Sequence, residues 1–296
     1  MRLRAFELNE PVPELNEPHA FASLRPWVDV GNVGTLTLSR LESYFYTLDL
    51  ASLARPGNFF DFTRYRPTLY LKEGNREVEI PNTTVTYARR ENDHDLLFLR
   101  LLEPHMLAEA YIDSVLELLR VFGVKRYCLL GAMYDMIPYT RPLMVTGVAS
   151  NLGLQNELAA NKVISSDYQG PTTALYLIGQ KALQLGMETI SLIVHLPNYL
   201  LMNDDYRGER KLMEVICSLY EFALPQADIE KAKEQEEQVR RIAEQMMQSD
   251  PRLKSILNQL EAHYDSRIRE GEEEVRLSPE VEKFLQDMNR RFGQGQ

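Results

Sequence analysis

The chain has 296 residues, a length that fits one large domain with an appendage, or two domains. Its formal net charge is −10, and its 44% hydrophobic and 26% charged side chains are typical of a globular protein. No apolar run approaches the roughly 20 residues that a membrane helix needs, and the first residues lack the apolar stretch of a signal peptide, so we expect a soluble, cytoplasmic protein. Because phosphate neutralisation requires clustered lysine and arginine, and no such cluster stands out, we expect no nucleic-acid partner.

Two glycines follow the first strand-like segment. Residues 27–30 are Trp-Val-Asp-Val, and Gly31 and Gly34 come next. This spacing is not that of a dinucleotide-binding loop, so we interpret it as a strand-to-helix turn. Backbone amides at the start of a helix can also bind an anion, which makes candidates of Gly31 and Asn32.

An aromatic and basic loop precedes a predicted hairpin. Residues 60–67 include Arg64, Tyr65 and Arg66. Arginine beside tyrosine is typical of anion sites and of interfaces, and it equally fits a loop pinned by carboxylates, so both interpretations stay open. Residues 68–71 and 77–80 flank a turn and predict a β-hairpin beside the parallel strands.

The middle of the chain alternates strand-length apolar runs with helix-length segments. Residues 95–99 and 126–130 predict buried strands around a helix over 104–122, which Gly123 ends. A helix over 172–185 and a strand over 190–196 repeat the pattern. We therefore predict a three-layer α/β/α body over residues 1–224, with a mixed, mainly parallel sheet.

Further polar candidates lie near predicted strand ends. Residues 135–142 include Tyr139, Thr140 and Arg141, for which a binding role and a pinning role are again both open. His195 comes late in the strand over 190–196, where α/β sheets usually bind ligands, although a core histidine bonded within the protein fits the position better.

The last 72 residues form a charged extension. They hold 28 of the Asp, Glu, Lys and Arg residues, against 48 in the first 224, so we place a boundary at residues 224–225. Asp250-Pro251 and Ser278-Pro279 predict helix starts that divide it into three helical pieces. Two pieces carry apolar stripes that must pack on each other, the body or another chain. The stripes are Leu253, Ile256, Leu257, Leu260, Tyr264 and Ile268, and Val281, Phe284, Leu285, Met288 and Phe292.

The sequence predicts no catalytic centre, metal site or cofactor. The five histidines show no ligand spacing, and no nucleophile elbow or phosphate-binding loop occurs. Cys128 and Cys217 lie in apolar stretches, so we expect two buried, reduced thiols.

Several segments together resemble the proteasome assembly chaperone family, in particular the bacterial relatives of its second eukaryotic member. They cover residues 27–31, 61–67, 131–142, Thr146-Gly147 and 168–172, the last with Gly170 and Pro171. The resemblance extends over roughly residues 15 to 224, and the longer bacterial members carry a similar helical extension.

The resemblance implies a nucleoside-phosphorylase-like α/β/α fold, a homo-oligomer with trimers known among bacterial members, and no established enzymatic activity. In archaeal and eukaryotic relatives a C-terminal hydrophobic-Tyr-any residue tail docks on the proteasome. Here residues 292–296 have no tyrosine at the penultimate place. The resemblance therefore predicts the fold and a protein partner, but not docking through that tail.

Two functions follow as hypotheses. The first is a non-catalytic, homo-oligomeric binding or assembly protein whose partners are its own copies and another protein complex. The alternative is a small-molecule or anion site, such as one for a nucleotide or phosphate, at the strand carboxyl ends. A third role for the arginine loops is to stabilise the subunit interface. The ligand or interface candidates are Trp27, Asp29, Gly31, Asn32, Arg64, Tyr65, Arg66, Tyr139, Thr140, Arg141, Thr146, Gly170, Pro171 and His195.

Overall fold

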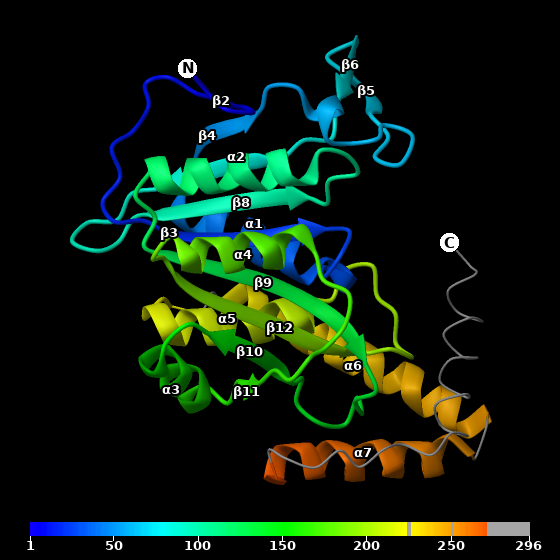
Figure 1. The fold of residues 1–296 in the computed structure, drawn as a ribbon. Helices are drawn as coiled ribbons and strands as arrows, with labels where there is room; N and C mark the ends of the chain where they lie inside the picture. The colour runs from blue at the N-terminus through cyan, green and yellow to red at the C-terminus, as the bar shows by residue number, and fades with distance from the viewer. Residues whose placement is uncertain (224–225, 250–251, 271–296) are drawn as a thin grey trace.

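A ten-stranded mixed sheet forms the centre of the computed structural model, which describes residues 1–223, 226–249 and 252–270 (Figure 1). The four central strands are parallel, and antiparallel strands join the sheet on both sides of them. In spatial order the strands are β1 (Arg2–Leu3), β2 (Phe6–Leu8), β4 (Leu48–Leu53), β7 (Thr84–Ala88), β8 (Leu96–Leu102), β3 (His19–Arg25), β9 (Arg126–Asp135), β12 (Glu188–Pro197), β10 (Val145–Ala149) and β11 (Ile164–Ser165).

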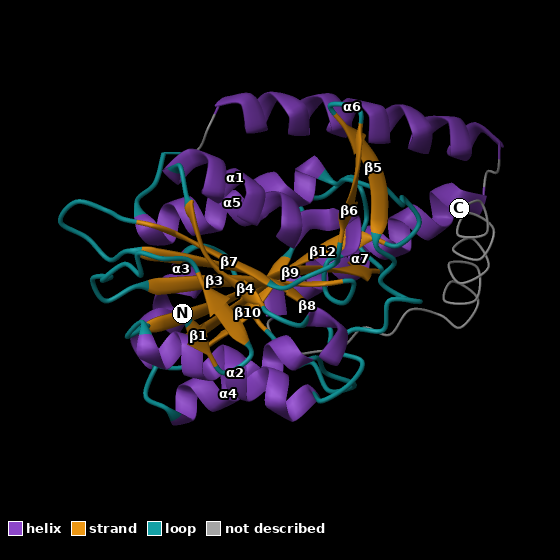
Figure 2. Cartoon of the chain, turned by 90° about the horizontal axis from the view of Figure 1, so that it is seen from above, coloured by secondary structure: helices purple, strands orange, loops and turns teal. Residues whose placement is uncertain are grey.

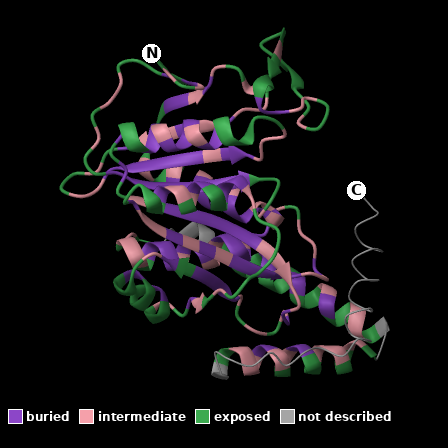
Figure 3. Ribbon diagram, viewed as in Figure 1, coloured by how far each residue is buried: buried purple, intermediate pink, exposed green. Residues whose placement is uncertain are grey.

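Helices cover both faces of this sheet (Figure 2). One face carries α2 (Ala108–Val121) and α4 (Ala174–Gln184), and the other carries α1 (Val33–Phe45), α3 (Leu152–Ala160) and α5 (Tyr206–Tyr220). Successive residues of β9 alternate between the two cores, so Leu129 packs towards α2 and α4 while Leu130 packs on the other side. The central strands are accordingly largely buried (Figure 3), which explains why most of their residues are apolar. The predicted α/β/α fold class is confirmed.

The prediction of a strand over residues 27–30 is wrong. β3 ends at Arg25, before Pro26, which has no N–H to donate to a strand ladder. Val28 then takes a left-handed backbone conformation (φ 61°), and Asp29 makes one isolated bridge, with Ala132. β3 also lies between β8 and β9, so these two strands pair with β3 and not with each other.

The predicted hairpin is present but separate from the main sheet. β5 (Thr68–Lys72) and β6 (Asn75–Glu79) form a two-stranded sheet of their own around Glu73 and Gly74, which both have positive φ. None of the ten strand residues is buried. The antiparallel strands that neighbour the parallel ones are instead β7 and β10.

The extension begins with two helices, α6 (Gln226–Ser249) and α7 (Arg252–Glu270). α6 packs along α5 and buries Ala232, Gln235 and Val239, and the Gln235 side-chain amide donates a 2.7 Å hydrogen bond to the Asp204 carbonyl. The predicted third piece, the stripe through Phe284 and Leu285 and the predicted helix start at 250–251 lie outside the described residues. No helix within the described ranges is long and apolar enough to cross a bilayer.

Gly131 allows the loop after β3 to approach β9. A Cβ atom at this position would overlap the Val28 carbonyl oxygen and lie 2.7 Å from Val28 Cγ1. We expect Gly131→Ala to lower the free energy of unfolding by about 1–3 kcal/mol in urea denaturation, because backbone atoms must move. Gly179→Ala is the control, since its nearest new contact is 3.6 Å from Tyr127 and α4 gains helix propensity. Equal stability of the two variants would contradict the prediction.

Candidate functional site

Two neighbouring parallel strands bring polar side chains together at their carboxyl ends. Asp135 ends β9, and His195 lies two residues before the end of β12, in a register that pairs Asp135 with Pro197. Thr146 reaches the same place from β10, which runs antiparallel to β12. The register of three strands thus assembles a cluster from residues up to 60 positions apart.

His195 stands at the centre of this cluster. Its Nδ1 lies 2.7 Å from Asp135 Oδ2, its Nε2 lies 2.8 Å from Thr146 Oγ1, and Arg267 of α7 donates from Nη1 to the same Asp135 oxygen at 2.9 Å. We call these four residues the His195 cluster. Burial alone would raise the pKa of Asp135, but the hydrogen bonds and charges of His195 and Arg267 outweigh it and hold that pKa well below its usual range.

The order threonine, histidine, aspartate is the hydrogen-bond order of a nucleophile, a base and an orienting acid. Here, however, His195 and Thr146 are only 5% and 7% exposed, and Arg267 covers Asp135 from outside. The arrangement therefore cross-links β9, β12 and β10 and joins them to α7. His195 is thus a buried histidine whose two ring nitrogens both have hydrogen-bond partners within the chain.

The second arginine loop is held by α7. The Arg141 guanidinium donates to both carboxylate oxygens of Asp265, from Nε at 2.9 Å and from Nη2 at 2.8 Å, and its Nη1 lies 3.2 Å from Glu261. Thr140 Oγ1 also hydrogen-bonds to Glu261. We call Thr140, Arg141, Glu261 and Asp265 the α7 clamp. The Asp265 carboxylate thus occupies the pair of N–H donors that the guanidinium would otherwise offer to an anionic ligand.

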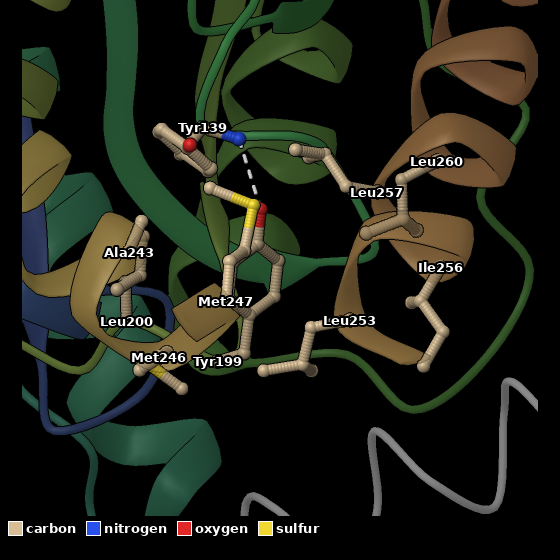
Figure 4. Close-up of a pocket in the computed structure, with 10 residues that line it drawn as sticks. All are labelled: Tyr139, Tyr199, Leu200, Ala243, Met246, Met247, Leu253, Ile256, Leu257 and Leu260. Atoms are coloured by element: carbon tan, nitrogen blue, oxygen red, sulfur yellow. Dashed lines mark hydrogen bonds between the residues drawn. The ribbon is translucent and has the colours of Figure 1, made fainter. Parts of the chain in front are cut away.

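Apolar contacts hold α7 beside the clamp. Tyr264 and Leu260 are buried against the body, and the Tyr264 hydroxyl donates to the Pro142 carbonyl at 2.9 Å. A small apolar pocket of about 40 Å³ remains in the corner between α6, α7 and the body (Figure 4). Tyr139 borders it, with its backbone N–H bonded to the Tyr199 hydroxyl at 2.9 Å. The predicted stripe around Leu257 and Leu260 thus faces the body of its own chain, as one of the predicted alternatives has it.

The glycine turn lies against the start of α5. Asp29 accepts hydrogen bonds from the Thr35 N–H at 3.1 Å and the Thr35 hydroxyl at 2.6 Å, and burial raises the pKa of Asp29. The Gly31 carbonyl accepts from the Asp205 N–H at 2.8 Å, and the Asn32 amide donates to Asp204. With acidic side chains on both sides, this turn has no electrostatic preference for an anion.

The remaining candidates are exposed or bonded elsewhere. Arg64, Arg66, Gly170 and Pro171 are exposed in loops, and Trp27 is 62% exposed. The Tyr65 hydroxyl donates to the Glu103 carbonyl at 3.1 Å, after the end of β8. The two arginine loops therefore have different partners: one is fastened to the end of β8 and the other to α7.

The sequence analysis missed a buried ion pair at the start of α5. Asp205 accepts from the backbone N–H groups of Arg207 and Gly208, and its carboxylate lies 2.5 Å from Arg207 Nη2. Asp205 is 1% exposed and Arg207 6%. The aspartate directly before an apolar-periodic helix was a visible capping signal, but nothing in the sequence indicated that the arginine would be buried.

The described residues contain no reactive cysteine and no group of three metal-ligating side chains. Cys128 and Cys217 are both buried and form no disulfide, and burial raises the pKa of the Cys128 thiol to about 11, which disfavours the nucleophilic thiolate.

Removing the arginine of the α7 clamp tests how α7 is held. We expect Arg141→Ala to speed backbone hydrogen exchange in α7 about fivefold, because both acidic partners lose their cation. Arg64→Ala is the matched control, since Arg64 lies 4.0 Å from Asp61 in an exposed loop and should leave exchange in α7 unchanged. Unchanged exchange in the Arg141 variant would show that apolar contacts alone hold α7.

One family model and several solved structures are similar to this chain. The model of the PAC2 family matches residues 23–246. A Mycobacterium tuberculosis protein of unknown function shares 24% identity, covers 98% of each chain and superposes with a TM-score of 0.74. A PAC2 family protein from Streptomyces avermitilis shares 24% identity over 77% of this chain and 96% of its own, with a TM-score of 0.70.

A third similar structure is described as a proteasome-assembly chaperone homologue from M. tuberculosis. It shares 19% identity over 75% of this chain and 94% of its own, with a TM-score of 0.67. No curated protein matches the sequence.

Proposed function

Because the chain belongs to the PAC2 family, we propose that it is a non-catalytic protein that binds other proteins, assists their assembly and associates with its own copies. A structural neighbour described as a proteasome-assembly chaperone homologue supports an assembly role. We propose the cytoplasm as its location, trimers as its form and a larger protein complex as its further partner.

One observation carries this proposal: apolar side chains stand exposed on the β5–β6 hairpin and on the residue directly after it, Ile80. Leu69, Leu71, Val78 and Ile80 are 47–73% exposed. Such grouped apolar exposure marks surfaces that bind protein. The polar candidates support the same conclusion, because Arg141 and His195 are both engaged within the chain.

Light scattering and native mass spectrometry of the purified full chain test the self-association. We expect a single species with the mass of a trimer. A monodisperse monomer at micromolar concentration would rule out the self-associating part of the proposal.

A second function, anion binding, rests on a different place. A cleft of about 620 Å³ lies between the loop at 139–143, α5 and α6, and Arg210, Lys211 and Arg240 line it together with Glu214, Glu236 and Glu244. Most of these cations already face carboxylates; Arg210, for example, lies 2.9 Å from Glu214. This partial neutralisation makes anion binding the weaker proposal.

Thermal shift with inorganic phosphate separates the two functions. If the cleft binds anions, phosphate should raise the Tm of the wild type, and Arg240→Gln should remove at least half of that rise. A phosphate response that is equal in both proteins, or absent from both, would leave protein binding as the function.

A further inference from the structure

The β5–β6 hairpin has one apolar and one polar face. Its register pairs Leu69 with Val78 and Leu71 with Arg76, so these four side chains share a face. The opposite face holds Tyr70 beside Glu77, whose side chains hydrogen-bond at 3.1 Å. An isolated two-stranded hairpin is only marginally stable in water. The three apolar side chains of this face are 58–73% exposed, so we expect another surface to pack against them.

A groove without charged side chains lies on the main sheet, towards the edge formed by β10 and β11. Its volume is about 300 Å³, and β9, β10, β12 and α4 line it with residues that include Tyr127, Val148, Gly179 and Leu183. None of its twelve lining residues is Asp, Glu, Lys or Arg. Val148 and Leu183 are 51% and 48% exposed. We call this surface the α4 groove.

The groove is open because of two local features. Gly179 has no side chain to fill the groove; a Cβ atom there would make only an ordinary contact, 3.6 Å from the Tyr127 ring, which lines the groove and is itself 1% exposed. α3, which contacts β10, packs with the other core, on the opposite face of the sheet. The α4 side of β10 therefore keeps Val148 exposed.

The placement of the two surfaces decides what can join them. In chain order the hairpin lies between β4 and β7, near one edge of the main sheet, whereas β10 and β12, which line the groove, lie near the other edge. The two surfaces therefore lie towards opposite ends of the molecule (Figure 1). The hairpin of one chain therefore cannot fill the groove of that same chain. With a net charge of −10, copies approach each other with least repulsion through surfaces that carry no acidic group, and both of these surfaces qualify.

We propose that the apolar face of the β5–β6 hairpin inserts into the α4 groove of a second copy of this chain. The inference rests on the proposed self-association and names its contact. Since the contact joins two different surfaces, a pair of copies keeps one free hairpin and one free groove, so that a third copy can bind. With the proposed trimer, the last hairpin enters the first groove and the assembly is a closed ring.

Charge insertion on each surface provides the test. Leu71→Glu places a carboxylate on the apolar face, and Gly179→Glu places one in the groove on a helix that tolerates it. We expect either change to raise the dissociation constant of the ring at least about thirtyfold in light scattering and native mass spectrometry. The matched controls, Asn75→Glu on the polar face of the hairpin and Gly179→Ala, should keep the wild-type mass.

Mixing the two glutamate variants identifies the type of contact. One intact hairpin and one intact groove remain in the mixture, so a 1:1 dimer should form that grows no further. To trap weak contacts, Leu71→Cys and Leu183→Cys proteins are mixed, and a mixed disulfide is expected, since Cys128 and Cys217 are buried.

The outcomes separate the two proposals. Wild-type mass in either glutamate variant, or disulfide dimers from Leu71→Cys alone and none in the mixture, would overturn the hairpin-to-groove contact while self-association stands. A monomeric wild type would overturn both. Binding of a foreign protein that Leu71→Glu abolishes, with the ring intact, would assign the hairpin to another partner and likewise overturn the contact.

Discussion

Asp205→Ala should lower the free energy of unfolding by about 3–5 kcal/mol, because it leaves the buried Arg207 cation without its carboxylate. The same change removes the side chain that accepts the Arg207 and Gly208 N–H groups at the start of α5. Chemical denaturation followed by circular dichroism measures the loss. The effect should also reach α6, since the Arg207 N–H lies 3.3 Å from the Gln235 side-chain oxygen.

A paired replacement shows whether the ion pair causes this loss. Asp205→Asn combined with Arg207→Met keeps an acceptor at the helix start and removes both charges, so the double variant should be more stable than Asp205→Ala. If Asp205→Ala costs less than about 1 kcal/mol, the buried pair does not stabilise this corner of the fold.

Asp135→Ala should cost about 2–3 kcal/mol at neutral pH, because it leaves His195 Nδ1 without its partner and frees Arg267. The effect should depend on pH. Since the pKa of Asp135 is lower in the folded than in the unfolded protein, its contribution is complete above the unfolded pKa of about 4 and is lost as the pH falls towards the folded pKa. Urea denaturation of both proteins between pH 7 and pH 3 measures this difference.

Arg267→Ala is the control for this prediction. It removes only the α7 cation, whose side chain is 30% exposed, so its cost should be smaller than that of Asp135→Ala. A stability difference between wild type and Asp135→Ala that does not shrink in acid would show that the charge of Asp135 is not what stabilises the cluster.

Several elements could be predicted from local sequence. The predicted strands over residues 95–99 and 190–196 are mostly apolar, as strands covered on both faces require, and they fall within or next to the central strands β8 and β12. Gly123 and Gly186 follow α2 and α4 with φ of 68° and 83°, the left-handed conformation that glycine adopts freely. The helical pattern of α7 likewise predicted that one face must be buried.

The partners of the candidate residues could not be predicted in this way. Arg141 and Asp265 are 124 positions apart, and Asp135 and Arg267 are 132 apart. Neither spacing belongs to any local pattern, so the sequence alone allowed an anion, a second chain or an internal carboxylate at Arg141. The packing of α7 on the body brings Asp265 to Arg141, so the partner is an internal carboxylate.

For the charged helical extension too, the local sequence predicted the helices, whereas tertiary packing determined their position. Its charged composition and its apolar stripes could be identified from the sequence, because helix periodicity depends on residues three and four positions apart. Where it lies depended on shape and charge at the carboxyl ends of β9 and β12, which exist only after distant strands have paired. The residue pattern thus determined that α6 and α7 form and need cover, and tertiary packing alone decided that the body of the same chain supplies it.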